Sequence, residues 1–335
     1  GSGYGITLLD GYAYEASTTG IQIINIESPE SAYFVNSIDN IYVIEQVAVS
    51  GDYAYVAGSR YFQVIDIDPP ESAYVLKTID TNLSYLNGLV VSGGYAYLAA
   101  HDDLYIIDIE PPESASIAHT VAAPDTIFGV SLSGGFAYIA NGDSGLQIID
   151  IDPPLSAHII SSVDTPDSAR GVAVSGDYAY VLEPTSLHPQ LDIIDINPPE
   201  SAYIVKSVEV WWYSSAVETS GGYAYVTDGN PHASGGTIKI FDTDPPESAH
   251  LVSSVTIPYD GYGFVVSDGY AYIACHYSYM STYYSELAIV DIDPPLSAHY
   301  ISSFATGVFA SSVAVSEGYA YVGCNSTGLA ILKLW

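Results

Sequence analysis

Short apolar segments alternate with turn residues along the whole chain. In one representative unit, the segments 129–132, 136–140, 146–151 and 157–163 are rich in Ile, Val, Ala and Tyr, and SGG, NGDSG and DPP turns separate them. These lengths and compositions are typical of β-strands, and no segment carries the longer apolar period of a helix. The pattern therefore predicts an all-β protein.

The same unit recurs eight times. A Tyr-Ala-Tyr triplet, or Phe-Ala-Tyr once, begins at Tyr12, Tyr53, Tyr95, Phe136, Tyr178, Tyr223, Tyr270 and Tyr319, at spacings of 41 to 49 residues. Four short strands repeated at this period predict an eight-bladed β-propeller with four antiparallel strands per blade. We predict a single domain over 1–335, with blades at about 4–40, 41–82, 83–124, 125–165, 166–209, 210–257, 258–305 and 306–335.

Residue choice within the strands fits this architecture. Each blade of a propeller is covered on both faces, so its strands are apolar on both sides, as in LQIIDI from Leu146. Side chains alternate along a strand, so the two rings of each Tyr-Ala-Tyr triplet share one face and the alanine lies on the other. We expect this large–small alternation to let neighbouring blades interdigitate.

The third segment of each unit carries a family resemblance. GLQIIDID from Gly145, LYIIDIE from Leu104, LAIVDID from Leu287 and FQVIDID from Phe62 each follow a YAYVA-like strand. With this pattern the chain resembles the LVIVD-repeat family of propellers, found in bacterial and archaeal cell-surface proteins. The resemblance covers almost the whole chain. It implies an extracellular or cell-surface location and suggests no catalytic residues.

Charge excludes several classes of partner. The chain has 39 Asp and Glu against 6 Lys and Arg, a net charge of −33. Contacts with phosphate require Lys and Arg, so we expect no nucleic-acid partner and no binding to anionic membranes. No run of 18 apolar residues is present, so we expect no membrane insertion.

Much of the acid lies in one recurrent turn, of which DIDPPESAY from Asp66 is an example. The proline pair ends the third strand and starts a reversal, and the preceding Asp is placed to bond the turn backbone. Asp66, Asp68 and Glu71 form a weak calcium candidate, because Ca²⁺ requires six to eight oxygen ligands. We favour a structural turn with diffuse cation attraction, and we predict no dedicated metal site and no cofactor.

Aromatic residues concentrate in the loops at the opposite ends of the strands in blades 5 to 7. They are Trp211, Trp212, Tyr213, Tyr259, Tyr262, Tyr277, Tyr279, Tyr283 and Tyr284. Clustered Trp and Tyr suit sugar rings or a protein-binding hot spot, so these residues are the candidate ligand site. The alternative is that they seal the enlarged loops, and for Trp211 and Trp212 we expect such inward packing.

The remaining motifs give little information about function. Asn82 (NLS) and Asn325 (NST) are candidate glycosylation sites. Cys275 and Cys324 occupy equivalent places in two repeats, so we expect buried thiols rather than a disulfide. The sequence contains no phosphate-binding loop, nucleophile elbow or HExxH helix, and we predict a protein that is not an enzyme.

The eighth unit is shorter than the others, because the sequence ends after its third segment, LAILKLW. We therefore predict a three-stranded last blade whose outer strand is an open edge, which invites pairing with another chain unless Lys333 blocks it. We expect a structural or interaction scaffold that binds protein chains or glycans, with homo-assembly through this edge into a filament or surface layer as one possibility. The alternative is a carbohydrate- or peptide-binding adhesin module that uses the aromatic loops.

Overall fold

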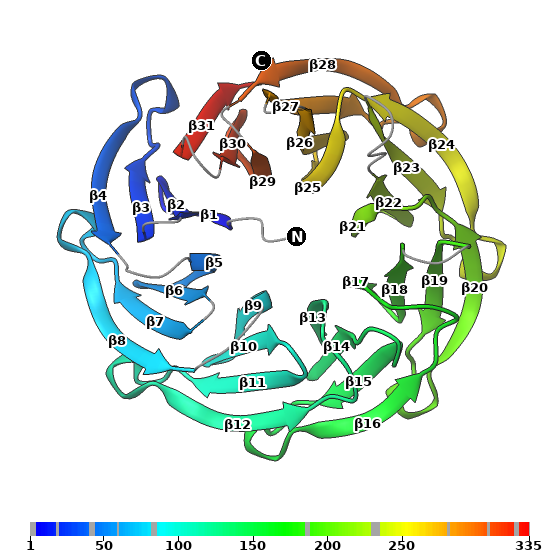
Figure 1. Ribbon diagram of the computed structural model, residues 1–335, viewed down its shortest axis with the longest axis horizontal. Coiled ribbons are helices and arrows are strands. Elements are labelled where there is room, and N and C mark those ends of the chain that lie inside the picture. Colours follow the sequence, from blue (N-terminus) through cyan, green and yellow to red (C-terminus); the bar gives the residue numbers. More distant parts are fainter. Residues whose placement is uncertain are drawn as a thin grey trace.

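The computed structural model describes residues 5–17, 20–39, 44–58, 60–81, 86–184, 188–228, 235–279, 282–306, 309–324 and 328–334. In this part of the chain the strands form eight antiparallel sheets, arranged as blades around a central axis (Figure 1). Seven sheets have four strands and the eighth has three, as the sequence predicts. We name the strands of each blade A to D from the centre of the ring to its rim.

In each blade the chain runs from the innermost strand to the outermost strand. Blade 1 has β1 (Ile6–Leu9), β2 (Tyr12–Ser17), β3 (Gly20–Asn25) and β4 (Tyr33–Asp39). Blade 2 has β5 (Ile44–Ser50), β6 (Tyr53–Gly58), β7 (Tyr61–Asp66) and β8 (Tyr74–Asp80). Blade 3 has β9 (Leu86–Ser92), β10 (Tyr95–Ala100), β11 (Asp103–Asp108) and β12 (Ser116–Ala122). Blade 4 has β13 (Gly129–Ser133), β14 (Phe136–Ala140), β15 (Leu146–Asp150) and β16 (His158–Val163).

The second half repeats this order. Blade 5 has β17 (Gly171–Ser175), β18 (Tyr178–Glu183), β19 (Gln190–Asp195) and β20 (Tyr203–Glu209). Blade 6 has β21 (Ser214–Ser220), β22 (Tyr223–Asp228), β23 (Gly236–Asp242) and β24 (His250–Ile257). Blade 7 has β25 (Asp260–Ser267), β26 (Tyr270–Tyr279), β27 (Thr282–Asp291) and β28 (His299–Ala305), and blade 8 has β29 (Ala310–Ser316), β30 (Tyr319–Cys324) and β31 (Gly328–Lys333).

The DPP segments form the turns between strands C and D. Each contains one turn of 3₁₀ helix: η1 (Pro29–Ser31), η2 (Pro70–Ser72), η3 (Pro112–Ser114), η4 (Pro154–Ser156), η5 (Pro199–Ser201), η6 (Pro246–Ser248) and η7 (Pro295–Ser297). In blade 2 the carboxylate of Asp66 accepts the Asp68 backbone N–H at 3.1 Å. The same bond recurs in blades 3 to 7, and Asn25 accepts it in blade 1. The first residue of the motif is therefore a side-chain cap that fixes the turn.

The core consists of apolar layers between neighbouring blades. Within each Tyr-Ala-Tyr triplet the alanine packs toward the preceding blade and the second tyrosine toward the next one. Ala13 lies in the layer between blades 8 and 1, whereas Tyr14 lies in the layer between blades 1 and 2. This confirms the predicted division of the triplet between two faces.

The layer that closes the ring is the smallest. Among the described residues, only Ala13, Ile26, Tyr319 and Tyr321 are fully buried between blades 8 and 1, whereas every other layer buries nine or more apolar residues. A buried carboxyl group, that of Glu15, also lies at this junction. No helix of the described residues is long and apolar enough to cross a membrane.

Candidate functional site

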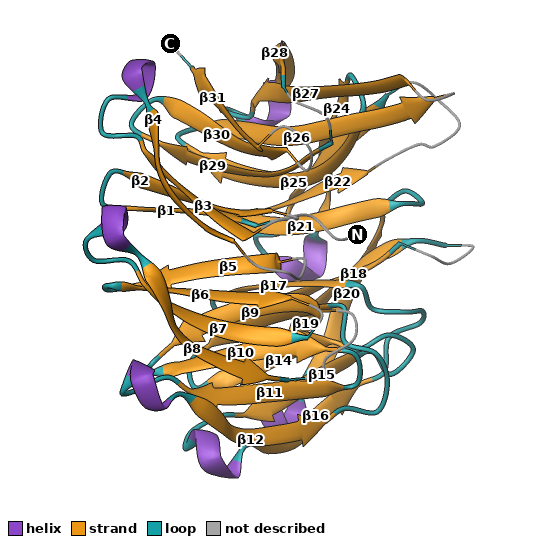
Figure 2. Cartoon of the chain, turned by 60° about the vertical axis from the view of Figure 1, so that its left-hand side comes forward, coloured by secondary structure: helices purple, strands orange, loops and turns teal. Residues whose placement is uncertain are grey.

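The two faces of the ring differ. Because strands alternate in direction, the A–B and C–D turns share one face, which we call the turn face, and the B–C and D–A connections share the other, the loop face. Figure 2 shows several of the short helices of the C–D turns along its left-hand side. More than half of the 39 acidic residues belong to turns of the turn face. No group of three or more metal-ligating side chains lies close enough to hold an ion in the described part of the chain.

The loop face carries most of the predicted aromatic site. The hairpin of β26 and β27 is longer than those of the other blades, and it pairs Tyr277 with Tyr284. The Tyr259 ring contacts both of them in stacked orientation, with its centroid 6.3 Å from that of Tyr277 and 5.8 Å from that of Tyr284. Burial raises the pKa of Tyr259, so this ring is a neutral, partly covered platform.

A second aromatic group lies beside it, at the start of blades 7 and 8. The Tyr262 ring stacks on His276 at 3.8 Å, and Phe309 contacts His276 edge-on at 5.2 Å and Tyr283 at 4.6 Å. Burial lowers the pKa of His276, which keeps the imidazole neutral. His276 and Phe309 were missed by the sequence reasoning, which counted only Trp and Tyr in these loops.

Trp211, Trp212 and Tyr213 form a separate group on blade 6. Their side chains are 58%, 51% and 54% exposed, so the expectation that the two tryptophans pack inward is wrong. These residues form a turn, in which Tyr213 has a left-handed φ of 67° and the Ser214 hydroxyl donates to the Trp211 carbonyl at 2.7 Å. The turn holds all three side chains on the surface, where the Trp211 ring lies 5.3 Å from the Lys239 ammonium.

Three further candidates lie outside what the structure describes: Asn82, Asn325 and the side chain of Tyr279. Both cysteines, Cys275 and Cys324, are buried thiols, as expected. The predicted aromatic residues that the structure describes therefore lie in three groups, around Tyr259, around Tyr262 and around Trp211, rather than in one.

The open edge of blade 8 is the second candidate surface. Among the described strands, β31 pairs only with β30. Its residues Leu329, Ala330, Ile331 and Leu332 are half-buried. The equivalent positions 287–290 of β27, which a fourth strand covers, are fully buried. The comparison defines a place for one more strand along β31.

The elements on either side of blade 8 also lack the contacts that a fourth strand would make with them. In other blades, strand D contacts the 3₁₀ turn of the next blade; for example, the Asn36 amide of β4 donates to the Pro70 carbonyl at 3.4 Å. At the end of the ring, Ile301 of β28 is 39% exposed, whereas the equivalent residues of blades 1 to 6 are half-buried. On the other side, Lys333 reaches Glu30 of η1 in an ion pair of 2.9 Å.

Comparison with known proteins agrees with this architecture. The LVIVD repeat pattern matches residues 44–81, 85–121, 128–165, 166–209, 213–231 and 309–332, together more than half of the chain. No curated protein sequence matches.

Similar solved structures include the computationally designed Ika8 protein, with 8% identity, a TM-score of 0.77 and coverage of 98% of this chain and 95% of that one. A functionally unknown protein from Desulfotomaculum acetoxidans DSM 771 has 14% identity, a TM-score of 0.67 and coverage of 99% of both chains. BamB from Moraxella catarrhalis has 13% identity, a TM-score of 0.72 and coverage of 98% and 96%. At these identities the likeness concerns the fold alone.

Proposed function

The chain belongs to the LVIVD repeat family, and we propose that it is a non-enzymatic interaction scaffold that acts outside the cell or on its surface. Its principal binding element is the open edge of blade 8, which accepts an extended segment of another polypeptide as a fourth strand. The observation that carries the proposal is the partial exposure of Leu329 to Leu332 on β31, at positions that are buried in a complete blade.

Strand addition fits an edge strand that, among the described strands, has a partner on one side only. Unpaired N–H and C=O groups of an edge strand bind a further strand through main-chain hydrogen bonds, and pockets for alternate side chains give specificity. A second copy of this chain would bring another −33 charges, so self-assembly into a filament or layer requires salt or divalent cations, whereas a less acidic partner binds without them.

The test uses the protein's own outer strand as the guest. A fluorescent peptide with the sequence of residues 293–305, DPPLSAHYISSFA, is expected to bind the wild-type protein in anisotropy titrations. The substitution Ile301→Lys in the protein, with the peptide unchanged, is expected to weaken peptide binding at least tenfold. Leu251→Lys is the matched control, because Leu251 is 46% exposed on β24, beside a complete blade.

A second variant separates binding from folding. Replacement of Trp335 by the same thirteen residues is designed to supply the fourth strand of blade 8, so it is expected to raise the melting temperature and to abolish peptide binding. Sedimentation at low and high salt then distinguishes a heterologous partner from self-assembly. If the wild-type protein does not bind the peptide, or if the extended variant binds it equally well, the edge is not a docking site.

The aromatic surface supports a second function, binding of a carbohydrate or peptide. Tyr283 and Tyr284 are 49% and 46% exposed, and each rests on another ring, that of Phe309 or Tyr259. Supported, half-exposed rings suit stacking against sugar faces. On a glycan array, Tyr283→Ala is expected to remove binding, whereas Tyr300→Ala, which removes an exposed ring on β28, is expected to leave it unchanged. Binding that survives Tyr283→Ala would reject this function.

A further inference from the structure

The innermost strands of the ring share an irregularity at the end that opens on the loop face. In β5, β9, β21, β25 and β29 one residue is skipped by the pairing with strand B. These residues are Glu45, Asn87, Ser215, Tyr262 and Ser311. Phe128 and Arg170 occupy the same place in blades 4 and 5, directly before β13 and β17. A β-bulge re-aims the side chain of its extra residue. In blades 3 to 5 the residue at this position, Asn87, Phe128 or Arg170, lines a cavity of the channel.

The residue at this position differs between blades, in a chain whose repeats are otherwise closely similar. The position that follows is small in most blades, because the inner strands converge there: a Cβ on Gly263 would lie 2.5 Å from the Ser311 carbonyl oxygen. Packing alone would allow the same side chain in every blade at the bulge. The mixture of acid, amide, aromatic and guanidinium groups instead suits an asymmetric ligand.

A cavity of about 280 Å³ opens at this ring in blades 2 to 6. Gln46, Asn87, Phe128 and Arg170 line it, together with glycines, one alanine and aliphatic Leu and Val residues of the inner strands. The Arg170 guanidinium carbon lies 4.1 Å from the centroid of the Phe128 ring. A protein with only 6 Lys and Arg thus places one of them, supported by an aromatic face, at the opening of its channel.

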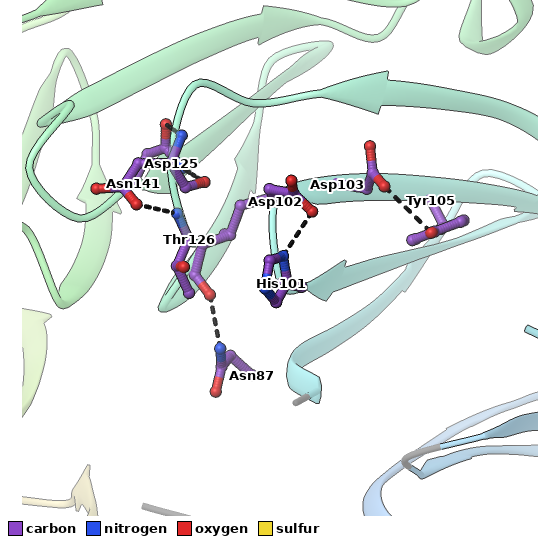
Figure 3. Close-up of polar contacts among 9 residues, drawn as sticks. Asn87, His101, Asp102, Asp103, Tyr105, Asp125, Thr126 and Asn141 are labelled. Atoms are coloured by element: carbon purple, nitrogen blue, oxygen red, sulfur yellow. Dashed lines mark hydrogen bonds and ion pairs between the residues drawn. The ribbon is translucent and has the colours of Figure 1, made fainter. Parts of the chain in front are cut away.

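The connection that carries Phe128 is fixed by side-chain hydrogen bonds (Figure 3). The Asn87 amide donates to the Ile127 carbonyl at 2.7 Å. Asp125 accepts the Thr126 backbone N–H at 2.7 Å, and the Asn141 side-chain oxygen accepts the Asp125 N–H at 3.2 Å. The Phe128 ring is therefore presented by a pre-organised loop.

Arg170 is held in a similar way. Its backbone N–H donates to the Leu182 carbonyl at 2.8 Å, and the Asp167 N–H earlier in the same connection donates to the Glu183 carboxyl at 2.7 Å. Glu183 is fully buried beside Asp192, and burial followed by the proximity of Asp192 raises the pKa of Glu183 well above its usual range. Burial therefore favours the protonated form of Glu183, whose carboxyl group accepts the Asp167 N–H in the Arg170 connection.

We propose that the channel mouth binds a monosaccharide-sized hydroxylated carboxylic acid, of which a uronic acid is the model. The Arg170 guanidinium accommodates the carboxylate through two parallel N–H···O bonds, and Phe128 keeps the guanidinium plane in position. The amides of Asn87 and Gln46 face the hydroxyl groups. A cavity of about 280 Å³ has room for about one sugar ring next to Arg170.

Calorimetric titration of the full chain with sodium D-glucuronate, D-glucose and glucose 6-phosphate tests this site. We expect glucuronate to bind at least tenfold more tightly than glucose. Arg170→Gln is expected to weaken glucuronate binding at least tenfold, and Arg170→Lys is expected to have an intermediate effect because the bidentate geometry is lost. Arg60→Gln is the matched control: it removes the same charge at a residue ion-paired with Asp80, 3.0 Å away.

Phe128→Leu is a second test, which leaves the charge intact and is expected to weaken binding several-fold. Melting temperatures of all variants establish that they are folded. Wild-type protein that does not bind glucuronate, or Arg170→Gln that binds it as wild type does, overturns the proposal. Tighter binding of glucose 6-phosphate than of glucuronate rejects the carboxylate and assigns the site to a phosphate.

Discussion

The second tyrosine of each Tyr-Ala-Tyr triplet packs its ring against the next blade, and in blade 5 its hydroxyl also bonds that blade. In blade 5 the Tyr180 hydroxyl donates to Thr243 of blade 6 at 3.2 Å. In blades 1 and 2 the rings of Tyr14 and Tyr55 are buried in the layer to the next blade. Burial first, and neighbouring acids and tyrosines second, raise the pKa of Tyr14 and Tyr55 to about 12.

These tyrosines predict alkaline sensitivity. The folded state favours the neutral phenol, so their contribution to stability is complete below the unfolded pKa of about 10 and is lost as the pH rises toward 12. The free energy of unfolding in urea is expected to fall across this window. Tyr55→Phe is expected to reduce the fall, whereas Tyr283→Phe, which removes an exposed hydroxyl, leaves it unchanged. Equal pH profiles for Tyr55→Phe and wild type would contradict this account.

Glu15 weakens the junction at which the ring closes. It takes the place that Val56, Leu98 and other apolar residues occupy in the following blades, and it is 1% exposed. Its Oε2 has no hydrogen-bond partner. Burial raises its pKa to about 7, and a hydrogen bond from the Cys324 backbone opposes the rise only in part.

A single substitution tests this junction. Because the folded pKa exceeds the unfolded one, ionisation of Glu15 costs stability progressively from about pH 4.5 to about pH 7 and constantly above that. Glu15→Gln stays neutral, so it is expected to match wild type near pH 4.5 and to be more stable by about 3 kcal/mol at pH 8. Chemical unfolding at both pH values measures the difference. A gap of equal size at both would show that ionisation is not the cause.

At the scale of elements, the DPP turn illustrates what a sequence predicts well. The motif recurs with Asp or Asn at its first position, and in each of blades 1 to 7 that side chain bonds the same backbone N–H. Both partners lie two residues apart, so local chemistry alone determines the turn. This is why the turn and the strands around it follow directly from the repeat.

We expect the cap to stabilise each blade separately. Asp150→Ala removes the bond of 2.9 Å to the Asp152 N–H and is expected to lower the free energy of unfolding by about 1 kcal/mol. Asp150→Asn keeps the accepting oxygen, as Asn25 does in blade 1, and is expected to cost less than half as much. Thermal unfolding of the two variants gives the comparison. If Asp150→Asn costs as much as Asp150→Ala, the carboxylate charge rather than the cap stabilises the turn.

The bulges of the innermost strands could not be predicted in this way. A bulge adds one residue to a strand without changing its composition, and its position depends on the register with strand B, which the repeat does not reveal at the strand end. The sequence reasoning therefore assigned the loop-face site to clustered Tyr and Trp and overlooked Asn87, Phe128 and Arg170. For the same reason it grouped Trp211 with Tyr283, although the two belong to separate aromatic groups.

At the scale of the whole molecule, the most prominent feature is the large negative charge. The acidic C–D turns form a ring on the turn face, and Glu71, Glu113, Glu200 and Glu247 occupy equivalent exposed places in it. Leu155 and Leu296 occupy the same place in blades 4 and 7, so the turn does not require an acid there. These four carboxylates therefore add repulsion at a position where they are not needed for the fold.

This repulsion predicts salt-dependent stability. Screening shortens from about 10 Å at 0.1 M salt to about 3 Å at 1 M, so the melting temperature is expected to rise by several degrees between 0.05 M and 1 M NaCl. Replacement of the four glutamates by glutamine lowers the net charge from −33 to about −29. The variant is expected to melt higher at low salt and to gain less from added salt, because part of the repulsion is already gone. If the melting temperature rises equally with NaCl in both proteins, the salt effect comes from hydrophobic burial instead. If the melting temperature of wild type does not rise, the charges of the turn face are too far apart to destabilise the ring.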